Sequence, residues 1–463
     1  MGRMVDMTGG RPTKQMLVFA VPLIAGNVGQ QLYMVADAVI VGRGVGVEAL
    51  AAVGATDWTY WLILWIVQAF TQGFAARISH YIGAADEIHI KKSISMSVVL
   101  CCVLGVSLTV LSLLIAAPML RLLDTPDNIF NYSISYLRTL FAGTVIVTAY
   151  NMASAILRAF GDGKTPLIGI AIAAVTNIGL DCLFVFAFHW GIIGAGVATV
   201  IAQMFAFLYC LFHLLKLPLK IERKYLKPDF KVIKVLCSLG VSMALQQAFI
   251  AVSGMVLQFA INLHGFIYVA GFTATNKLYG LLESSSLAFG YAVTTYMAQN
   301  YGAKRYDRIR KGMKSILLIS FILALFISVV MLIFGKSILS LFISSTDENA
   351  ATVMEVAYHY LSIMSFTLPT LYLLNGFRST LQGLGQGLAV MFSGIVESLG
   401  RISIALFLSK IWSELIFFSE PGTWIITNIY LIVVCAIVLK KVTKPVKQAG
   451  DVPSFAGKSR ETR

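Results

Sequence analysis

Charged residues are scarce in this sequence, and their scarcity excludes an ordinary soluble protein. Only 13% of the 463 residues are Asp, Glu, Lys or Arg, while 58% are hydrophobic. Soluble domains carry about 25% charged residues. Apolar runs of about 20 residues, the length that crosses a bilayer as a helix, recur along nearly the whole chain. The composition therefore predicts a polytopic membrane protein.

Motifs of enzymes and redox proteins are also missing. The sequence contains no GxxxxGK[ST] loop for a nucleotide phosphate and no HExxH pair for zinc, and its six histidines are scattered. Its six cysteines lie in or beside apolar runs without CxxC spacing, so we interpret them as small buried hydrophobes. We therefore expect no enzyme activity, no cofactor and no disulfide.

Twelve apolar runs are long enough to span a bilayer, and they are continuous rather than alternating, which predicts helices and not a barrel. They cover residues 15–41, 57–80, 93–117, 133–157, 166–188, 194–215, 232–257, 268–298, 315–334, 353–374, 388–408 and 415–439. The expected fold class is an all-α polytopic membrane protein with twelve transmembrane helices.

Basic residues gather in alternate loops, which predicts the orientation of the chain. Lys91 and Lys92 follow the second run, whereas the loops at 189–193 and 262–267 contain no Lys or Arg. Because cytoplasmic loops are enriched in Lys and Arg, we expect both termini in the cytoplasm. The net charge of +14 is then explained by topology rather than by binding to nucleic acid.

The second half of the chain repeats landmarks of the first half. The segment YIGA at 81–84 matches NYGA at 300–303, and LRAFGDG at 157–163 matches LQGLGQG at 381–387. Six spans per half make the two copies run parallel, and transporters place the substrate path between such halves. We expect two pseudo-symmetric six-helix lobes around a central cleft. The expected parts are an N-lobe (1–217), a cytoplasmic linker (218–231), a C-lobe (232–441) and a basic cytoplasmic tail (442–463).

Two acids interrupt the apolar runs of the first half. Asp37 lies in the first run, and Asp181 lies in the fifth run, four residues after Asn177 and therefore on the same helix face. A central carboxylate costs roughly 2.5–3.5 kcal/mol to insert and usually marks an ion pathway. With the Thr199 hydroxyl, these side chains offer oxygen ligands for Na⁺ or a relay for a proton. The alternatives are solvation of an acid at a span end and, for Thr199, a bond to its own helix backbone.

Other residues inside the runs are candidates for a hinge and a substrate cavity. Pro22 removes a backbone hydrogen bond from the first run, so we expect either a hinge or a fixed kink there. The acids of the second half either attract a cationic substrate or pair with a neighbour such as Lys277 or Arg401. The cavity candidates, for each of which packing is the alternative, are Tyr33, Gln246, Gln247, Met255, Glu283, Phe289, Met297 and Glu397.

Several motifs occur in one order along residues 5–442. They include FAVPLIAGNVGQQLYMVADAVIVGR, EALAAVGAT, LRAFGDGKTP and GIIGAGVATVIAQ. With these motifs the chain resembles the multidrug and toxic compound extrusion (MATE) family of transporters. The resemblance implies twelve helices in two lobes around a cleft. It also implies efflux of organic, often cationic, compounds in exchange for Na⁺ or H⁺, across a bacterial inner membrane.

The resemblance also assigns residues of the first lobe. Asp37 matches the family's first-helix aspartate, and Asn177 and Asp181 match its fifth-helix pair. Thr199 matches the sixth-helix threonine of the archaeal-type cation site, and Pro22 matches the first-helix proline that bends on protonation. The coupling ion, Na⁺ or H⁺, is therefore expected at Asp37, Asn177, Asp181 and Thr199.

The second lobe departs from the family pattern. The family's other cation site uses a glutamate in helix seven and an aspartate in helix ten, but here run seven offers Gln246 and Gln247 and run ten has no interior acid. We therefore expect a monomeric antiporter that couples in its first lobe, with a small organic substrate and the bilayer as partners.

The alternatives are a lipid-linked oligosaccharide flippase, a membrane enzyme and a passive channel. A cavity lined by Arg401 and Lys277 would favour the flippase.

Overall fold

The computed structural model describes residues 5–217, 219, 222–340, 342–343 and 349–442, and helices account for most of them. The first half contains α1 (Pro12–Gly44), α2 (Val47–Gly83), α3 (Glu87–Leu122), α4 (Asp127–Ala142), α5 (Thr144–Ala159), α6 (Lys164–Asp181) and α7 (Gly191–Leu215). The second half contains α8 (Phe230–Asn262), α9 (Phe266–Gly302), α10 (Tyr306–Leu339), α11 (Ala350–Gly383), α12 (Gly387–Ser403), α13 (Ser409–Ile411) and α14 (Ser419–Val442). Short 3₁₀ segments, η2 (Arg223–Leu226) and η4 (Ser413–Phe418), precede α8 and α14, and π-helical segments, η1 (Cys182–Ala187) and η3 (Ile404–Leu408), follow α6 and α12.

The predicted all-α membrane architecture is confirmed. In the described part of the chain, nine helical segments are long and apolar enough to cross a membrane, or ten if α4 and α5, which meet at 47°, form one span. That bend divides the predicted span 133–157 at Gly143, which separates the two helices. The long helices α9 and α11, predicted as spans eight and ten, are not among the nine because they carry more polar side chains.

Large apolar side chains cover the outer surfaces of the helices. Leu114 on α3 is 71% exposed, Val175 on α6 is 75% exposed and Phe326 on α10 is 67% exposed. Exposure of so continuous an apolar surface to water would be unfavourable, whereas contact with lipid hydrocarbon is not. These outer surfaces therefore match the hydrocarbon of a bilayer.

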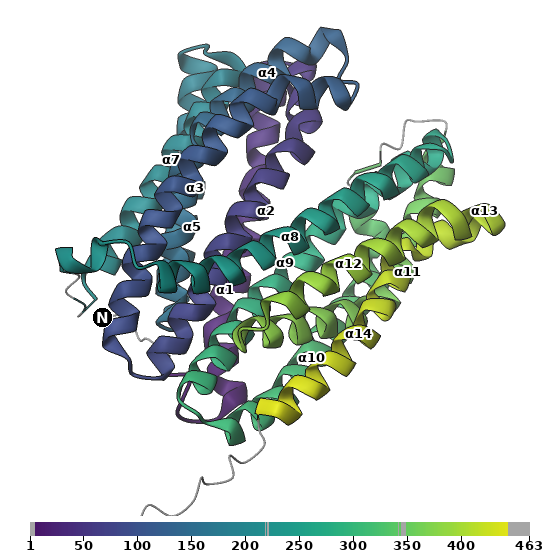
Figure 1. The fold of residues 1–463 in the computed structure, drawn as a ribbon. Helices are drawn as coiled ribbons and strands as arrows, with labels where there is room; N and C mark the ends of the chain where they lie inside the picture. Colours follow the sequence, from purple (N-terminus) through teal and green to yellow (C-terminus); the bar gives the residue numbers. More distant parts are fainter. Residues whose placement is uncertain (1–4, 218, 220–221, 341, 344–348, 443–463) are drawn as a thin grey trace, which may run out of the picture.

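The helices form two lobes that meet at one end and diverge toward the other (Figure 1). Helices α2–α7 lie in one arm and α8–α14 in the other, while α1 packs on α6 of its own arm and on α9 of the other. Packing of α2 against α8 and α9 completes the contact between the arms. The predicted two-lobe arrangement is therefore confirmed; the predicted boundaries of the lobes stay a prediction, and the tail at 443–463 lies outside the described residues.

The turns of the second lobe copy those of the first lobe. Ala85, between α2 and α3, has a φ of 54°, and Lys304, between α9 and α10, has a φ of 56°. Gly161 and Gly385, between α5 and α6 and between α11 and α12, have φ values of 81° and 73°. The π-helical segments η1 and η3 follow the corresponding helices α6 and α12. Matching backbone conformations at matching positions agree with the sequence repeat.

Glycines let the lobes approach closely at the end where they meet. A Cβ atom on Gly83 at the end of α2 would collide with the carbonyl of Gln299 on α9, and one on Gly302 would collide with the carbonyl of His80 on α2. The His80 and Tyr301 rings lie 5.3 Å apart at the same crossing. We call this end, which carries the α2–α3, α5–α6 and α9–α10 turns, the meeting end.

Candidate functional site

The two acids of the first lobe lie against each other across the contact of α1 with α6. Asp37 is 9% exposed and Asp181 is 0% exposed, and their carboxyl groups are close enough for a protonated one to donate to the other. No other described N–H or O–H group reaches Asp37 Oδ1 or either carboxyl oxygen of Asp181. The structure thus brings together two carboxyl groups whose oxygens lack the donors that buried acceptors normally have.

Asn177 and Thr199 extend this site toward α7. Asn177 is 1% exposed, and its Nδ2 donates a hydrogen bond of 3.3 Å to Thr199 Oγ1. The Thr199 hydroxyl in turn donates to the carbonyl of Ala195, one turn earlier on its own helix, at 3.1 Å. Thr199 therefore makes the bond to its own helix backbone that was the alternative to a role as a cation ligand. It also accepts a hydrogen bond from the Asn177 amide. The Oδ1 atom of Asn177 is buried without a partner among the described residues.

The local helix geometry changes at Asp181. α6 is α-helical up to Asp181 and continues as the π-helical segment η1 from Cys182. Single π turns inside helices occur frequently at functional sites, because the extra residue shifts the side chains that follow. The corresponding segment η3 follows α12, where the sequence has no acid at the matching position. The π-helical segment thus occurs in both lobes, but it is preceded by an acid, Asp181, in the first lobe and by Ser403 in the second.

A group of polar side chains surrounds the acids, and most of them were not predicted from the sequence. Tyr33, expected in the substrate cavity, lies near Gln203 on α7 and near Asp37. Tyr60 on α2 and Tyr136 on α4 lie in the same region, close enough for the charge of Asp37 to act on them. Gln203 carries a signal that sequence reasoning could have used, since it follows Thr199 by four residues in an apolar run. Nothing in the local sequence points to the two tyrosines.

The donor set of this site fits a small hard cation or a proton. Four buried oxygens, one of Asp37, one of Asn177 and both of Asp181, accept no hydrogen bond from the other described groups. Two adjacent carboxylates repel each other when both are charged, and unpaired charges are costly to bury. A shared proton or a bound Na⁺ lowers both costs by compensating one of the two negative charges, and Na⁺ is a hard cation that takes oxygen ligands. No cluster of three or more His, Cys, Asp or Glu suited to a metal occurs in the described ranges.

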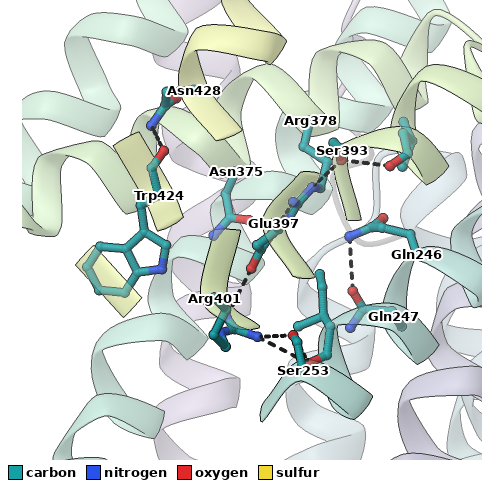
Figure 2. A network of polar contacts seen from close by, with 12 residues as sticks. Gln246, Gln247, Ser253, Asn375, Arg378, Ser393, Glu397, Arg401, Trp424 and Asn428 are labelled. Carbon is teal, nitrogen blue, oxygen red and sulfur yellow. Dashed lines mark hydrogen bonds and ion pairs between the residues drawn. The ribbon is translucent and has the colours of Figure 1, made fainter. Parts of the chain in front are cut away.

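The buried acid of the second lobe, Glu397, is saturated by guanidinium groups (Figure 2). Arg378 on α11 forms a short ion pair with Glu397 Oε2, and Arg401 reaches Glu397 Oε1 at 3.2 Å. Arg401 also donates to Glu420 on α14 at 2.7 Å and to Ser253 Oγ on α8 at 2.7 Å. The network joins α8, α11, α12 and α14. Glu397 is paired with Arg401, as one of its two interpretations from the sequence expected.

Glu283 differs from Glu397 in its partners. It is half-buried on α9 and is hydrogen-bonded to Tyr279, one turn earlier on the same helix. Lys277, its expected neighbour, instead lies 4.0 Å from Asp57 of the first lobe. Glu283 therefore remains a candidate for contact with a cationic substrate.

The remaining predicted residues lie apart from the acid pair. Gln246 is buried and donates to Gln247 at 3.1 Å (Figure 2), while Met255 is half-buried on the same helix. Phe289 and Met297 are 2% and 0% exposed in the apolar core of the second lobe, so in this conformation they pack in the core and are inaccessible to a ligand. α1 continues without interruption through Pro22, so its role as a hinge stays a prediction.

Comparison with known proteins finds a transporter family and named multidrug resistance proteins. The family MatE matches residues 22–183 and again residues 242–407, once in each lobe. The chain is 29% identical over 397 residues to "Probable multidrug resistance protein YpnP" of Bacillus subtilis (strain 168), which covers 85% of this chain and 86% of that protein. It is 24% identical over 417 residues to "Multidrug export protein MepA" of Staphylococcus haemolyticus (strain JCSC1435), with 87% and 90% covered.

Solved structures share the fold. A MOP superfamily transporter from Pyrococcus furiosus, whose title reports a binding pocket of reverse polarity, superposes with a TM-score of 0.89 at 22% identity and covers 96% of this chain and 99% of its own. A multidrug resistance MATE family transporter described in an outward-facing conformation also gives a TM-score of 0.89, at 21% identity and with the same coverage. With a family match in both lobes and this fold, the chain belongs to the MatE family of multidrug and toxic compound extrusion transporters.

Proposed function

We propose that this protein is a secondary antiporter that exports organic, cationic compounds in exchange for Na⁺ or H⁺. The observation that carries the proposal is the set of four buried oxygens on Asp37, Asn177 and Asp181 that no other described donor serves. Such a set favours binding of a cation or a proton. The names of the relatives, a multidrug resistance protein and a multidrug export protein, support small organic molecules as substrates.

The distribution of basic residues supports an orientation in the membrane. Lys91, Lys92, Lys304 and Arg305 all lie at the meeting end. By the preference of Lys and Arg for the cytoplasmic side, this end faces the cytoplasm of a cell with the protein in its inner membrane, and both termini are cytoplasmic. The lobes then diverge toward the outside, in agreement with the similarity to a chain described as outward-facing.

A transport cycle follows from this arrangement. A cation that enters from outside neutralises Asp37 and Asp181, and the packing of α1 against α6 then changes. Because α1 also packs on α9 of the C-lobe and carries Pro22, a change in α1 alters the contact between the lobes. Rocking of the lobes exposes the path between them to each side in turn. The half-buried acid Glu283 is the proposed contact for a cationic substrate.

The two basic residues that would favour the flippase, Arg401 and Lys277, each have an acidic neighbour. That function requires basic side chains free to bind phosphate, but the Arg401 guanidinium is engaged by Glu397, Glu420 and Ser253. Lys277 lies beside Asp57. We also propose that the protein acts as a monomer, since the cation site is built within one lobe.

The test uses purified protein in liposomes loaded with a fluorescent cationic dye. A Na⁺ gradient and a proton gradient are imposed separately, and dye movement is recorded for wild type, Asp37→Asn and Asp181→Asn. The matched control is Asp124→Asn, which removes an exposed acid at the α3–α4 turn. Size-exclusion profiles establish that each variant is folded.

We expect wild type and Asp124→Asn to transport dye with one of the two gradients, and both site variants to lose gradient-driven transport. Transport by folded Asp181→Asn at the wild-type rate would contradict the mechanism. Dye movement that follows its own gradient but never runs against it would indicate a channel.

A further inference from the structure

The segment 5–10, which precedes α1, runs between the two lobes at the meeting end. Its Val5 amide donates to the carbonyl of Gly161, in the α5–α6 turn of the N-lobe, at 3.0 Å. Met7 is 0% exposed, and its amide donates to Gln299 Oε1 on α9 of the C-lobe at 3.3 Å. Asn300 Nδ2 donates to the Met7 carbonyl at 2.8 Å. One short segment therefore bonds to both lobes, and we call it the strap.

Arg308 on α10 holds the strap from the C-lobe side. It is 7% exposed, and its guanidinium donates to the carbonyls of Gly9 and Gly10 at 2.7 Å each and to that of Met7 at 3.1 Å. Two more donor bonds go to Gln15 Oε1 and Asn300 Oδ1, both at 2.8 Å.

No carboxylate lies within ion-pair distance of Arg308 in the described ranges. Its buried positive charge is therefore stabilised largely by hydrogen bonds to the strap carbonyls. Charge-assisted bonds of this kind are strong, and a buried guanidinium that loses its acceptors is costly.

The same place joins the lobes directly. Gln299, whose side chain accepts from Met7, donates through Nε2 to the carbonyl of Ala159 at the end of α5 at 2.8 Å. Gln299 also lies where a Cβ atom on Gly83 would collide with its carbonyl. Separation of the lobes at the meeting end therefore requires the contacts of Gln299 and of the strap to break together.

The strap is also connected to the cation site. It leads at Gly10, which has a φ of 62°, into α1, and α1 runs unbroken from Pro12 past Asp37. Gln15 in the first turns of α1 both accepts from Arg308 and donates to the carbonyl of Asp6. A shift of α1 that begins at Asp37 is thus passed along one helix to the strap.

We propose that the strap is a latch that holds the lobes closed at the meeting end, with Arg308 as the positioning residue that receives it. The latch must open in each cycle for the lobes to separate at this end. This inference rests on the proposed alternating-access function. A simple anchor for the N-terminal segment would stabilise the fold but would leave the distance between the lobes unchanged.

The test measures the distance between one spin label on each lobe, at Glu87 on α3 and Lys311 on α10. Both residues are exposed near the meeting end, and the six native cysteines are first replaced in a background that retains dye transport. The protein is in lipid nanodiscs without substrate or ion gradient, so the result does not depend on which ion or dye is transported. Two variants weaken the strap from opposite sides.

The first variant, Arg308→Gln, removes the guanidinium, and Arg305→Gln, an exposed arginine just before α10, is its control. The second, Gly161→Ala, places a methyl group against the Val5 carbonyl. Its control is Gly385→Ala, because both glycines have positive φ values, 81° and 73°, but a Cβ atom on Gly385 meets no atom within 4 Å. The backbone strain is similar in the two glycine variants, and only Gly161→Ala disturbs the strap.

We expect Arg308→Gln and Gly161→Ala to raise the ratio of separated to closed distances at least tenfold, and the two controls to match wild type. If Arg308→Gln does not fold, the glycine pair decides alone. Closed distances in folded Gly161→Ala equal to those in Gly385→Ala would overturn the latch. Absence of ion-driven dye transport by wild type, with the shift in distance still present in the strap variants, would instead count against the antiport function and leave the latch standing.

Discussion

At the scale of single residues, burial alone does not tell which acid has a transport role; its partners do. Asp181 and Glu397 are both buried acids in apolar helices. Glu397 is held by Arg378 and Arg401, whereas neither oxygen of Asp181 is reached by a described donor other than its neighbour Asp37. Glu397 therefore cross-links helices, and we propose that a proton or cation binds the unpartnered carboxyl oxygens of Asp181.

This contrast predicts opposite effects of mutation on stability. Arg401→Leu leaves Glu420 without its guanidinium partner and Glu397 with Arg378 alone, and breaking a buried ion pair costs about 3–5 kcal/mol. Asp181→Asn removes an unpaired buried carboxyl group, so we expect an unchanged or higher melting temperature. Thermal unfolding in detergent, followed by intrinsic fluorescence, measures both variants. Equal destabilisation by the two would make the acid pair a structural element like the Arg401 network.

At the scale of elements, small residues and helix caps decide how the helices meet. Gly83 and Gly54 both lie on α2, but a Cβ atom on Gly83 would collide with the Gln299 carbonyl, while one on Gly54 meets no atom within 4 Å. The repeated YIGA and NYGA segments are therefore the place where α2 and α9 touch. The sequence allowed their position in the repeat to be predicted, but the contact itself joins residues more than two hundred positions apart.

The two glycines of α2 provide a matched pair for a second prediction. Gly54→Ala should raise stability, by about 0.5–1 kcal/mol, because alanine has the higher helix propensity and the site is open. Gly83→Ala should lower it, since the backbone of α9 must move away. The melting temperatures of the two variants, compared with wild type, test this. A rise for both would mean that α2 and α9 do not approach closely at the meeting end.

Asp229, just before α8, gives a pH-dependent prediction. The Lys92 ammonium at 2.9 Å, with the amides of Lys231 and Val232, holds the pKa of this carboxyl group below its usual value. A group whose pKa is lower in the folded state contributes stability above its unfolded pKa and loses it as the pH falls through the folded pKa.

We therefore expect Asp229→Ala to lower stability near neutral pH by about 1 kcal/mol, the usual value of a helix cap. The difference from wild type should shrink toward zero as the pH falls into the acidic range. Unfolding curves recorded at a series of pH values provide the measurement. A difference that stays constant down to acidic pH would show that the carboxylate charge plays no part in the cap.

At the scale of the whole molecule, the two lobes have similar backbone conformations but differ in their buried acidic residues. The turns at Ala85 and Lys304 and the π segments η1 and η3 match. Among the described residues, the buried carboxyl oxygens without a hydrogen-bond donor belong to Asp37 and Asp181 of the first lobe. Hydrophobic runs, loop charges and repeated motifs predicted the helical lobes, and the four-residue spacing of Asn177 and Asp181 predicted one face of the site. These features are local or periodic, so a sequence displays them directly.

Other features depend on tertiary contacts that no local pattern encodes. The partner of Glu397 on α11, Arg378, comes from a different helix, and Tyr60 and Tyr136 approach Asp37 from two others. The strap at 5–10 has an unremarkable polar sequence, and its role becomes visible only when Arg308 folds over its carbonyls. The helices α9 and α11 form where spans eight and ten were predicted. They are less apolar than the nine segments because many of their side chains are buried against other helices.

We propose that Asp37 and Asp181 together hold the coupling proton or Na⁺. Infrared difference spectroscopy of the purified protein, recorded as pH or Na⁺ concentration is changed, detects a carboxyl group that gains or loses a proton. We expect a protonated-carboxyl band that titrates in wild type and in Glu397→Gln and is absent in Asp37→Asn and Asp181→Asn. Displacement of that band by Na⁺ at constant pH would identify Na⁺ as a coupling ion. A band that persists unchanged in Asp181→Asn would show that Asp181 does not hold the coupling proton.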